Sequence, residues 1–156
     1  MLTDILAYRE IDADLATAGL PTEAQLHAVA AAGFTVVINL SPDSPERVAQ
    51  GYALANEQAI VEALGMHYYS LPVPWDAPTP QHVDIFCQLL ENATPHKVFI
   101  HCALNRRVSA FLMLYRITRL HWPREAAEAD MLALWGDELA AEPQWQNLIT
   151  QVLTPL

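Results

Sequence analysis

The sequence predicts an α/β fold in which a mainly parallel central sheet is flanked by helices. Three short apolar runs, rich in β-branched or aromatic residues, alternate with segments of helical periodicity. Strands separated by helices of this length are typical of βαβ units, whose strands run parallel. The 156 residues contain no internal repeat and no Gly/Ser-rich linker, so we expect a single domain over residues 1–156.

Glycine and proline residues separate the predicted elements in the first half of the chain. Pro21 or Thr22 begins the first helix and Gly33 ends it, while Gly65 ends the second. The apolar, β-branched run between these helices is typical of a buried strand. The predicted elements are a helix to about residue 32, a strand over 34–40, a turn over 41–45, a helix over about 46–64 and a strand over 66–73.

Prolines also divide the second half of the chain. Pro72, Pro74, Pro78 and Pro80 confine residues 73–81 to an ordered loop. A later helix is apolar almost all round, which predicts that it is the central, buried one. The elements are a helix over 79–92, a strand over 97–101, this central helix over 109–120, and helices over 123–135 and 143–153.

The composition limits the partners and the compartment. Eighteen acidic against eight basic residues give a formal charge of −10, which argues against nucleic acid. No apolar run is long enough for a membrane helix, and the N-terminus lacks the lysines of a signal peptide. Two cysteines, Cys87 and Cys102, make no disulfide framework, so a reduced, cytoplasmic protein is expected. The six histidines show no ligand spacing, so neither a metal nor another cofactor is expected.

The charge is unevenly distributed along the chain. From Lys97 to Arg124 there are six basic residues and no acid, whereas the remaining residues hold two basic residues and all 18 acids. We expect some of these arginines, including Arg116 and Arg119, to pair with acids of the C-terminal helices. The positive segment still makes a single phosphate an acceptable ligand.

The loop after the strand over 97–101 carries the residues best suited to chemistry. In parallel sheets the working site lies at the carboxyl ends of the strands. A helix dipole and nearby guanidinium groups favour the nucleophilic thiolate form of a cysteine. Backbone N–H groups in a strand-to-helix turn form an anion nest, and an arginine can hold two phosphate oxygens at once. The connection reads His101-Cys102-Ala103-Leu104-Asn105-Arg106-Arg107-Val108-Ser109.

This segment resembles the phosphate-binding loop of the cysteine-dependent phosphatases, the protein tyrosine and dual-specificity class. Their signature is His-Cys, five residues, Arg, then Ser or Thr. Segments 15–22, 32–40 and 65–69 extend the resemblance to a small bacterial branch of dual-specificity-like phosphatases, over about residues 10–122. The resemblance implies a protein tyrosine phosphatase-like fold and metal-independent hydrolysis of phosphate monoesters through a phosphocysteine. The implied substrate is a phosphorylated protein or a small phosphate ester.

The resemblance also implies roles for the loop residues. Cys102 is the nucleophile, and the side chain of Arg107 and the backbone N–H groups from Ala103 to Val108 hold the phosphate oxygens. His101 orients the loop through hydrogen bonds, and Ser109 hydrogen-bonds the departing thiolate. Asn105 stands where the family has a glycine, and asparagine tolerates a left-handed backbone. Arg106 is either a surface charge or a second contact to the phosphate oxygens.

The spacing to the arginine leaves two registers open. The family places its arginine six positions after the cysteine, where this chain has Val108, and Arg107 comes one residue early. In one register the loop is a residue shorter and Arg107 holds the phosphate. In the other, Val108 fills the arginine position and the protein is a catalytically impaired module that binds anions or partners. The shorter loop is favoured, because an arginine next to the expected position would otherwise be a coincidence.

A cysteine followed by four residues and an arginine also resembles some rhodanese-type sulfurtransferases, which carry a persulfide. Their loops have a basic residue directly after the cysteine and then a glycine two positions later. This chain has Ala103 and Asn105 at those places, so the match is poorer.

The general acid of these phosphatases comes from a loop upstream of the cysteine. The corresponding residue is Asp76, in the loop between Val73 and Pro78, although a turn or cap role fits it as well. Asp84 is the alternative, but it falls within a predicted helix. In the same loop, Trp75 either lines the mouth of a pocket or packs against its neighbours.

Other aromatic and sulfur-containing residues are interpreted as packing. Trp122, Trp135 and Trp145 are expected to anchor the core near the C-terminal helices. Cys87 has no basic neighbour in the sequence and is expected to pack as well.

Overall fold

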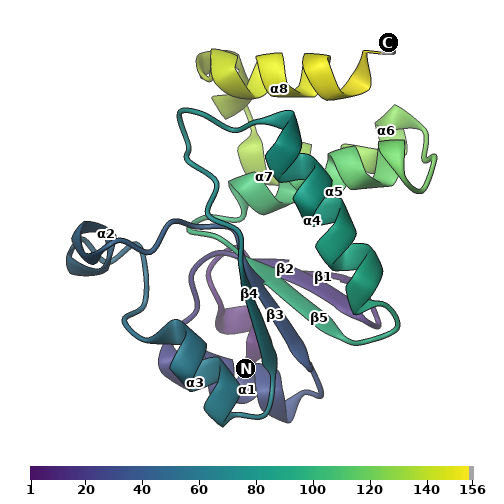
Figure 1. Ribbon diagram of the computed structural model, residues 1–156. Helices are drawn as coiled ribbons and strands as arrows, with labels where there is room; N and C mark the ends of the chain where they lie inside the picture. The colour runs from purple at the N-terminus through teal and green to yellow at the C-terminus, as the bar shows by residue number, and fades with distance from the viewer. Residues whose placement is uncertain (155–156) are drawn as a thin grey trace.

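The computed structural model describes residues 1–154, which form a five-stranded sheet between two layers of helices (Figure 1). Four neighbouring strands run parallel and β1 joins one edge in the antiparallel sense. The predicted α/β class with a mainly parallel sheet is thus confirmed. In spatial order the strands are β1 (Arg9–Asp12), β2 (Leu15–Ala18), β5 (Val98–His101), β3 (Val36–Asn39) and β4 (His67–Ser70).

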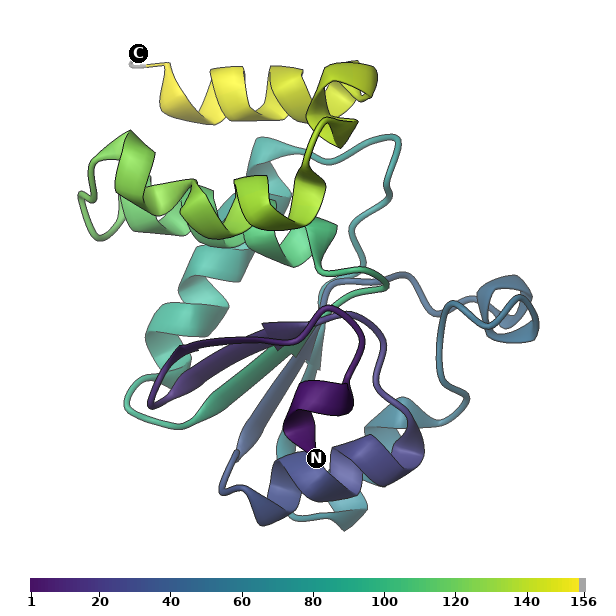
Figure 2. The same cartoon turned by 180° about the vertical axis from the view of Figure 1, so that it is seen from behind.

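The helices divide between the two faces of the sheet, as Figures 1 and 2 show. One face carries η1 (Leu2–Asp4), α1 (Glu23–Ala31) and α3 (Glu57–Ala63). A short helix, α2 (Pro45–Ala49), projects from the body of the molecule. The other face carries α4 (Pro80–Ala93), α5 (Arg106–Thr118), α6 (Arg124–Ala127), α7 (Ala129–Trp135), η2 (Glu138–Ala141) and α8 (Pro143–Leu153).

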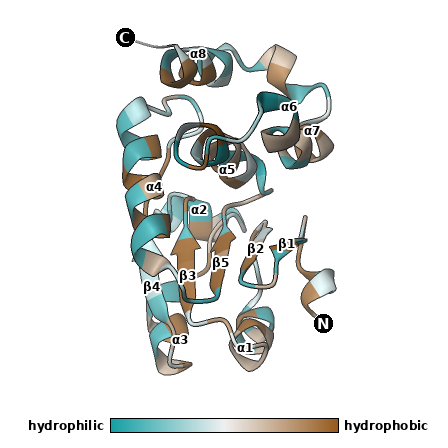
Figure 3. Cartoon of the chain, turned by 90° about the vertical axis from the view of Figure 1, so that its right-hand side faces the viewer, coloured by the Kyte–Doolittle hydropathy of each residue, from teal (hydrophilic) through white to brown (hydrophobic). Residues whose placement is uncertain are grey.

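The central strands β3 and β5 are buried at every position, because both faces of the sheet are covered. Side chains alternate between the layers. Ile38 and Ile100 pack with the α4 and α5 side, whereas Val37 and Phe99 pack with α1 and α3. This double burial explains the apolar runs by which the strands were predicted, and both strands are strongly hydrophobic in Figure 3.

Helix α5 is the central helix that its all-round apolar sequence predicted. Residues 107–114 and Arg116 are all buried. The helix begins at Arg106, three residues before the predicted start at residue 109. The earlier start is decisive for the site, because it brings both arginines of the loop into the first turn of the helix.

The single helix predicted over residues 46–64 is wrong. The chain forms α2 and α3 with a non-helical segment between them. Gly51 and Asn56 in this segment have φ angles of +82° and +59°, which a continuous right-handed helix does not allow. The helix predicted over 123–135 is likewise two helices, α6 and α7. The β1–β2 hairpin was not predicted, because its four-residue strands are too short to show a clear period.

The C-terminal tryptophans follow the prediction in two cases out of three. Trp135 and Trp145 are fully buried, but Trp122 is 40% exposed. Trp122 instead covers the guanidinium of Arg116 at 4.4 Å, so it packs on a charge at the surface and does not anchor the core. Within residues 1–154, every helix falls short of the length or the apolar character that a membrane crossing requires.

Candidate active site

The loop with Cys102 lies at the carboxyl end of β5, between that strand and α5. Cys102 follows the last strand residue directly, and Asn105 immediately precedes the helix. The backbone N–H groups of the first turn of α5 have no partners within the helix, so this end of the helix is suited to binding an anion. The position agrees with the general location of sites in parallel sheets.

A cavity of about 290 Å³ opens onto this loop. Its walls combine three arginines, two aromatic residues and Cys102. The lining residues are Arg47, Tyr52, Trp75, Cys102, Ala103, Leu104, Arg106 and Arg107. No acidic residue belongs to this lining, so the described part of the cavity is positive despite the overall charge of −10.

The two candidate arginine positions, 107 and 108, lie in different environments. Arg107 lines the cavity beside Cys102 and is 5% exposed. Val108 is fully buried in the hydrophobic core on the α4–α5 side. The chain therefore directs Arg107 into the cavity and Val108 away from it, which is the geometry of the shorter-loop register.

Arg107 is buried without a carboxylate partner. Burial lowers the pKa of its guanidinium, and the adjacent Cys102 acts in the opposite direction by favouring the charged form. Its Nε atom has no hydrogen-bond partner among the described residues. Burying a cation with an unsatisfied hydrogen-bond donor costs free energy unless an anion binds to it. A phosphate would supply both the negative charge and the acceptor. The ring of Trp75 supports the guanidinium, 5.5 Å from its central carbon.

Asn105 holds the loop in shape. It adopts the left-handed conformation, with φ 62° and ψ 16°, as its place at the family's glycine position led us to expect. Its side chain is fully buried and points away from the cavity, where Nδ2 donates to the carbonyl of Ala7 at 3.0 Å and to Oγ1 of Thr17 at 2.9 Å. The Asn105 side chain thus anchors the loop to β2 and the N-terminal segment, and only its backbone can serve a ligand.

Gly19 allows the loop to approach the end of β2. A Cβ atom at Gly19 would lie 2.5 Å from the carbonyl oxygen of Ala103 and 3.0 Å from that of Leu6. The amide of Leu20 donates to the same Ala103 carbonyl at 3.0 Å. Only glycine fits this close approach without displacing the loop.

His101 connects the Cys102 loop to α3. Its Nε2 lies 2.6 Å from Oε2 of Glu57, and its Nδ1 lies 3.2 Å from the carbonyl oxygen of Cys102. The side chains of His101 and Glu57 are 0% and 5% exposed. The contacts agree with the orienting role that the resemblance implied, and they add Glu57, which no sequence pattern indicated.

Ser109 and Arg106 each make a contact that the resemblance did not indicate. The Ser109 hydroxyl donates to the carbonyl of Arg106 at 3.1 Å, so in this structure it bonds to its own helix and not to Cys102. Arg106 lines the cavity but also lies 3.8 Å from a Glu138 carboxylate oxygen. It is therefore both a wall of the cavity and a surface charge.

Trp75 is held by the C-terminal helices. Its ring stacks on Trp135 and packs at a tilt of 42° against Trp145, each at a centroid distance of 5.3 Å. Its carbonyl accepts the indole N–H of Trp145 at 2.9 Å, and the indole N–H of Trp135 donates to the carbonyl of Arg106 at 2.9 Å. Trp75 thus both lines the cavity and packs against its neighbours, so the two interpretations of this residue are both correct.

The two candidate acids lie outside the cavity in this structure. Asp76 follows Trp75 in a turn and is exposed, and its side chain is not part of the cavity lining. Asp84 accepts from Nη2 of Arg119 at 2.6 Å on the far side of α4. The expected partners of Arg119 were acids of the C-terminal helices, and this is wrong, because both its carboxylates, Asp84 and Glu91, lie on α4.

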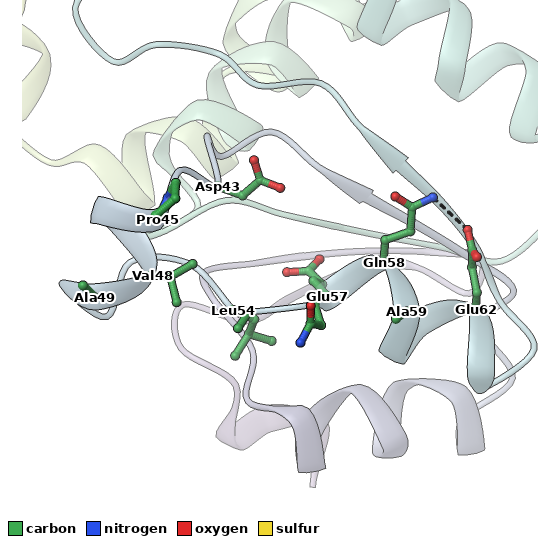
Figure 4. A pocket seen from close by; sticks show the side chains of 11 residues that line it. Asp43, Pro45, Val48, Ala49, Leu54, Glu57, Gln58, Ala59 and Glu62 are labelled. Atoms are coloured by element: carbon green, nitrogen blue, oxygen red, sulfur yellow. Dashed lines mark hydrogen bonds between the residues drawn. The ribbon is translucent and has the colours of Figure 1, made fainter.

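A larger cavity of about 810 Å³ lies between α2 and α3 (Figure 4). Its lining contains the carboxylates of Asp43, Glu57 and Glu62 and no basic side chain. Such a lining repels a phosphate, so this cavity is not the site suggested by the loop. Within residues 1–154, no group of three or more His, Cys, Asp or Glu side chains could hold a metal ion.

Arg47, Tyr52 and Glu57 are the site residues that sequence reasoning missed. All three lie between β3 and β4, in the region predicted as one uniform helix. Nothing in a helical pattern distinguishes an arginine that turns toward a distant loop from one that faces solvent. The break between α2 and α3, marked only by Gly51 and Asn56, was the available signal.

Comparisons with known proteins agree with this geometry. The family model for the phosphatase-like domain of beta-lactamase hydrolase-like proteins matches residues 7–118. A crystal structure of a candidate phosphatase (DUF442) from Shewanella putrefaciens CN-32 has a TM-score of 0.86 and 36% identity, over 97% of this chain and 92% of that chain. No match is found among curated proteins.

Two more distant structures share the fold. Tk-PTP in its active form has a TM-score of 0.73 and 18% identity, over 94% of this chain and 95% of that chain. TpbA of P. aeruginosa, solved with pTyr, has a TM-score of 0.71 and 19% identity, over 92% and 83%. The fold is thus that of the cysteine-dependent protein tyrosine phosphatases. The family match and the Shewanella relative together show that the chain belongs to the phosphatase-like domain family of beta-lactamase hydrolase-like proteins.

Proposed function

We propose that this protein hydrolyses phosphate monoesters through a phosphocysteine, without a metal ion. The observation that carries the proposal is that Cys102 and Arg107 line one cavity at the N-terminus of α5, and that Nε of Arg107 has no hydrogen-bond partner among the described residues. The thiolate supplies a nucleophile, and the guanidinium and the helix N-terminus supply the positive charge that a phosphoryl group in transit requires.

In the first step the Cys102 sulfur attacks phosphorus and the bond from phosphorus to the ester oxygen breaks. The leaving alcohol takes a proton from Asp76, and the phosphoryl group stays on sulfur. Arg107 and the backbone N–H groups of residues 103–108 hold the three oxygens that remain on phosphorus.

In the second step a water molecule attacks the phosphocysteine and gives its proton to Asp76. The sulfur–phosphorus bond breaks, inorganic phosphate leaves, and Cys102 returns to the thiolate. One ester and one water thus yield one alcohol and one phosphate. We assign the acid to Asp76 because it directly follows Trp75, the residue of its loop that lines the cavity. Because Asp76 lies outside the cavity in this structure, the proposal requires its side chain to turn toward the leaving oxygen when substrate binds.

The substrates that suit this site are phosphorylated proteins and small phosphate esters. TpbA, which shares the fold, is seen with pTyr. The cavity of about 290 Å³ has two aromatic walls and admits a ring as well as a small alkyl group.

Turnover of p-nitrophenyl phosphate tests the proposal. We expect activity for the unmodified protein, inhibition by vanadate, and loss of turnover in Cys102→Ser. Rapid acid quenching should trap a phosphoryl group on Cys102, detected by mass spectrometry. A pure, folded protein that neither turns over the ester nor forms the phosphoenzyme would contradict it and favour a module that only binds anions.

A further inference from the structure

Arg47 is the second arginine of the cavity that no carboxylate neutralises. Within residues 1–154, five of the seven arginines lie within 4.0 Å of an acidic oxygen, and the two that do not are Arg47 and Arg107. The chain has 18 acids for eight basic residues, so carboxylates are abundant. Both arginines without an acidic partner nevertheless line the same cavity.

The structure fixes Arg47 in place. Its Nε donates to the carbonyl of Pro42 at 2.7 Å, and its Nη2 donates to the Ser41 hydroxyl at 3.0 Å. Its guanidinium lies over the ring of Tyr52, 5.6 Å from the centroid. These contacts tie the side chain to the segment that follows β3, the strand beside β5. No hydrogen bond found within residues 1–154 uses Nη1 of Arg47, a residue that lines the cavity.

Two like charges facing one small cavity repel each other. Besides burial, the positive charge of Arg47 lowers the pKa of Arg107. An anion between them or beside each removes this repulsion. Arg107 and the loop N–H groups suit one phosphate, and Arg47, Tyr52 and Trp75 belong to the rest of the lining that is available to its ester group.

We infer that Arg47 binds a second anionic group of the substrate, so that the preferred substrates are phosphate esters carrying a further carboxylate or phosphate. This inference rests on the proposed function, because it places the first phosphate over Cys102. Arg47 offers one free end of its guanidinium, which suits a terminal anion at the rim of the cavity. Such an anion is found on small esters and on phosphopeptides with acidic neighbours.

The test compares esters that differ only in charge. The kcat/KM values for 3- and 4-carboxyphenyl phosphate are measured against those for the matching carboxamides. A charge-assisted hydrogen bond predicts a preference for the carboxylate of about 10- to 100-fold. The carboxamide withdraws electrons more strongly and is the better leaving group, so intrinsic reactivity works against the expected preference.

Variants then assign the preference to Arg47. In Arg47→Ala and Arg47→Gln the ratio of carboxylate to carboxamide should fall to about one. Because the measured quantity is the ratio of the two kcat/KM values, a loss of activity that affects both esters equally leaves it unchanged. Arg47→Gln keeps a donor for the Pro42 carbonyl if the alanine variant loosens α2. Arg124→Ala, an exposed arginine outside the cavity, should keep the full ratio.

The outcomes separate the inference from the proposed function. If the unmodified protein hydrolyses all the esters but its carboxylate-to-carboxamide ratio of kcat/KM is near one, the proposed function stands and the inference is overturned. A ratio that persists in the Arg47 variants, or an equal loss on both esters, also overturns it. If no ester is hydrolysed, the proposed function fails. Calorimetric titration with the same pairs of esters then tests the inference through the ratio of their dissociation constants. Peptides with Asp or Asn beside phosphotyrosine identify whether the second anion comes from a protein.

Discussion

At the scale of single residues, the direction of two neighbouring side chains decides what the loop can do. Arg107 and Val108 are one position apart, yet one lines the cavity and the other lies in the core. Successive residues of a helix point about 100° apart, so the first turn of α5 cannot place both in the cavity. The start of α5 at Arg106 sets which of them faces Cys102.

The two positions predict opposite phenotypes. Arg107→Ala should lower kcat/KM for p-nitrophenyl phosphate by about 100-fold or more, because it removes the cation that faces the phosphate. Val108→Ala should keep the activity and lower the free energy of unfolding by about 2 kcal/mol, because it leaves a cavity in the core. Steady-state kinetics and urea denaturation measure both. A Val108 variant with the larger kinetic loss would favour the other register.

The assignment of Asp76 as the general acid predicts that the effect of its substitution on the rate depends on the leaving group. Asp76→Asn should slow phenyl phosphate strongly and p-nitrophenyl phosphate much less, because nitrophenolate leaves without needing a proton. We expect a difference of about 10- to 100-fold between the two losses. Asp84→Asn, on α4, is the matched control and should slow both esters equally or not at all. Equal losses in Asp76→Asn would remove Asp76 from the reaction.

At the scale of secondary-structure elements, the cavity is held in place by contacts between segments far apart in the sequence. The end of β2 touches the Cys102 loop at Gly19, α3 reaches His101 through Glu57, and the C-terminal helices hold Trp75. Each contact fixes a different side of the same loop or of its cavity. The site therefore depends on the packing of elements as much as on the loop itself.

The contact at Gly19 predicts a coupled loss of stability and activity. Gly19→Ala should lower the free energy of unfolding by about 1–3 kcal/mol, because the new methyl group overlaps backbone atoms that cannot turn aside. Turnover should fall as well, since Ala103 borders the cavity. Urea denaturation and steady-state kinetics test this. Unchanged values for both would show that the loop tolerates the methyl group.

Asp130 predicts a pH-dependent contribution to stability. It accepts from Nε of Arg9 at 2.9 Å and from Nη1 of Arg116 at 2.6 Å, and so joins α7 to β1 and α5. Burial alone would raise the pKa of Asp130, but the hydrogen bonds from both arginines outweigh it and place the pKa below its ordinary value. The contribution is complete above the unfolded pKa, near pH 4, and is lost as the pH falls below it.

Asp130→Asn should therefore lower the free energy of unfolding by about 2 kcal/mol at pH 7. The difference from the unmodified protein should shrink as the pH is lowered from 4 toward 2. Asp137→Asn is the control, because Asp137 is exposed and should change the stability by less than about 0.5 kcal/mol. A cost for Asp130→Asn that does not vary with pH would contradict the assignment.

At the scale of the whole molecule, the helices after α5 contribute side chains to the hydrophobic core as well as to the surface. The family model ends at residue 118, yet Met131, Trp135, Trp145, Leu148 and Ile149 beyond it are all buried. They cover α5 and the ring of Trp75. The segment after residue 118 is thus part of the structure that forms the cavity.

A chain that ends at residue 118 should consequently fail to fold cooperatively. It would expose the faces of Phe86 and Phe111 that the C-terminal helices cover, and leave Trp75 without its stacking partners. Thermal unfolding followed by circular dichroism measures this. A chain ending at Leu153 is the control and should unfold as the full chain does. A sharp transition in the shorter chain would show that the matched region is autonomous.

The sequence by itself indicated the α/β class and most of the helices, and it placed Cys102, with Arg107 favoured over Val108, at the centre of the candidate site. These features depend on local signals: apolar periodicity, cap residues and the spacing of one loop. The tertiary structure alone decided that Arg107 faces the cavity and Val108 the core, that Glu57 contacts His101, and that Arg47 joins the site. Those relations link residues 44 to 60 positions apart, or depend on where a helix begins. Because packing sets side-chain directions across such distances, no local pattern in the chain records them.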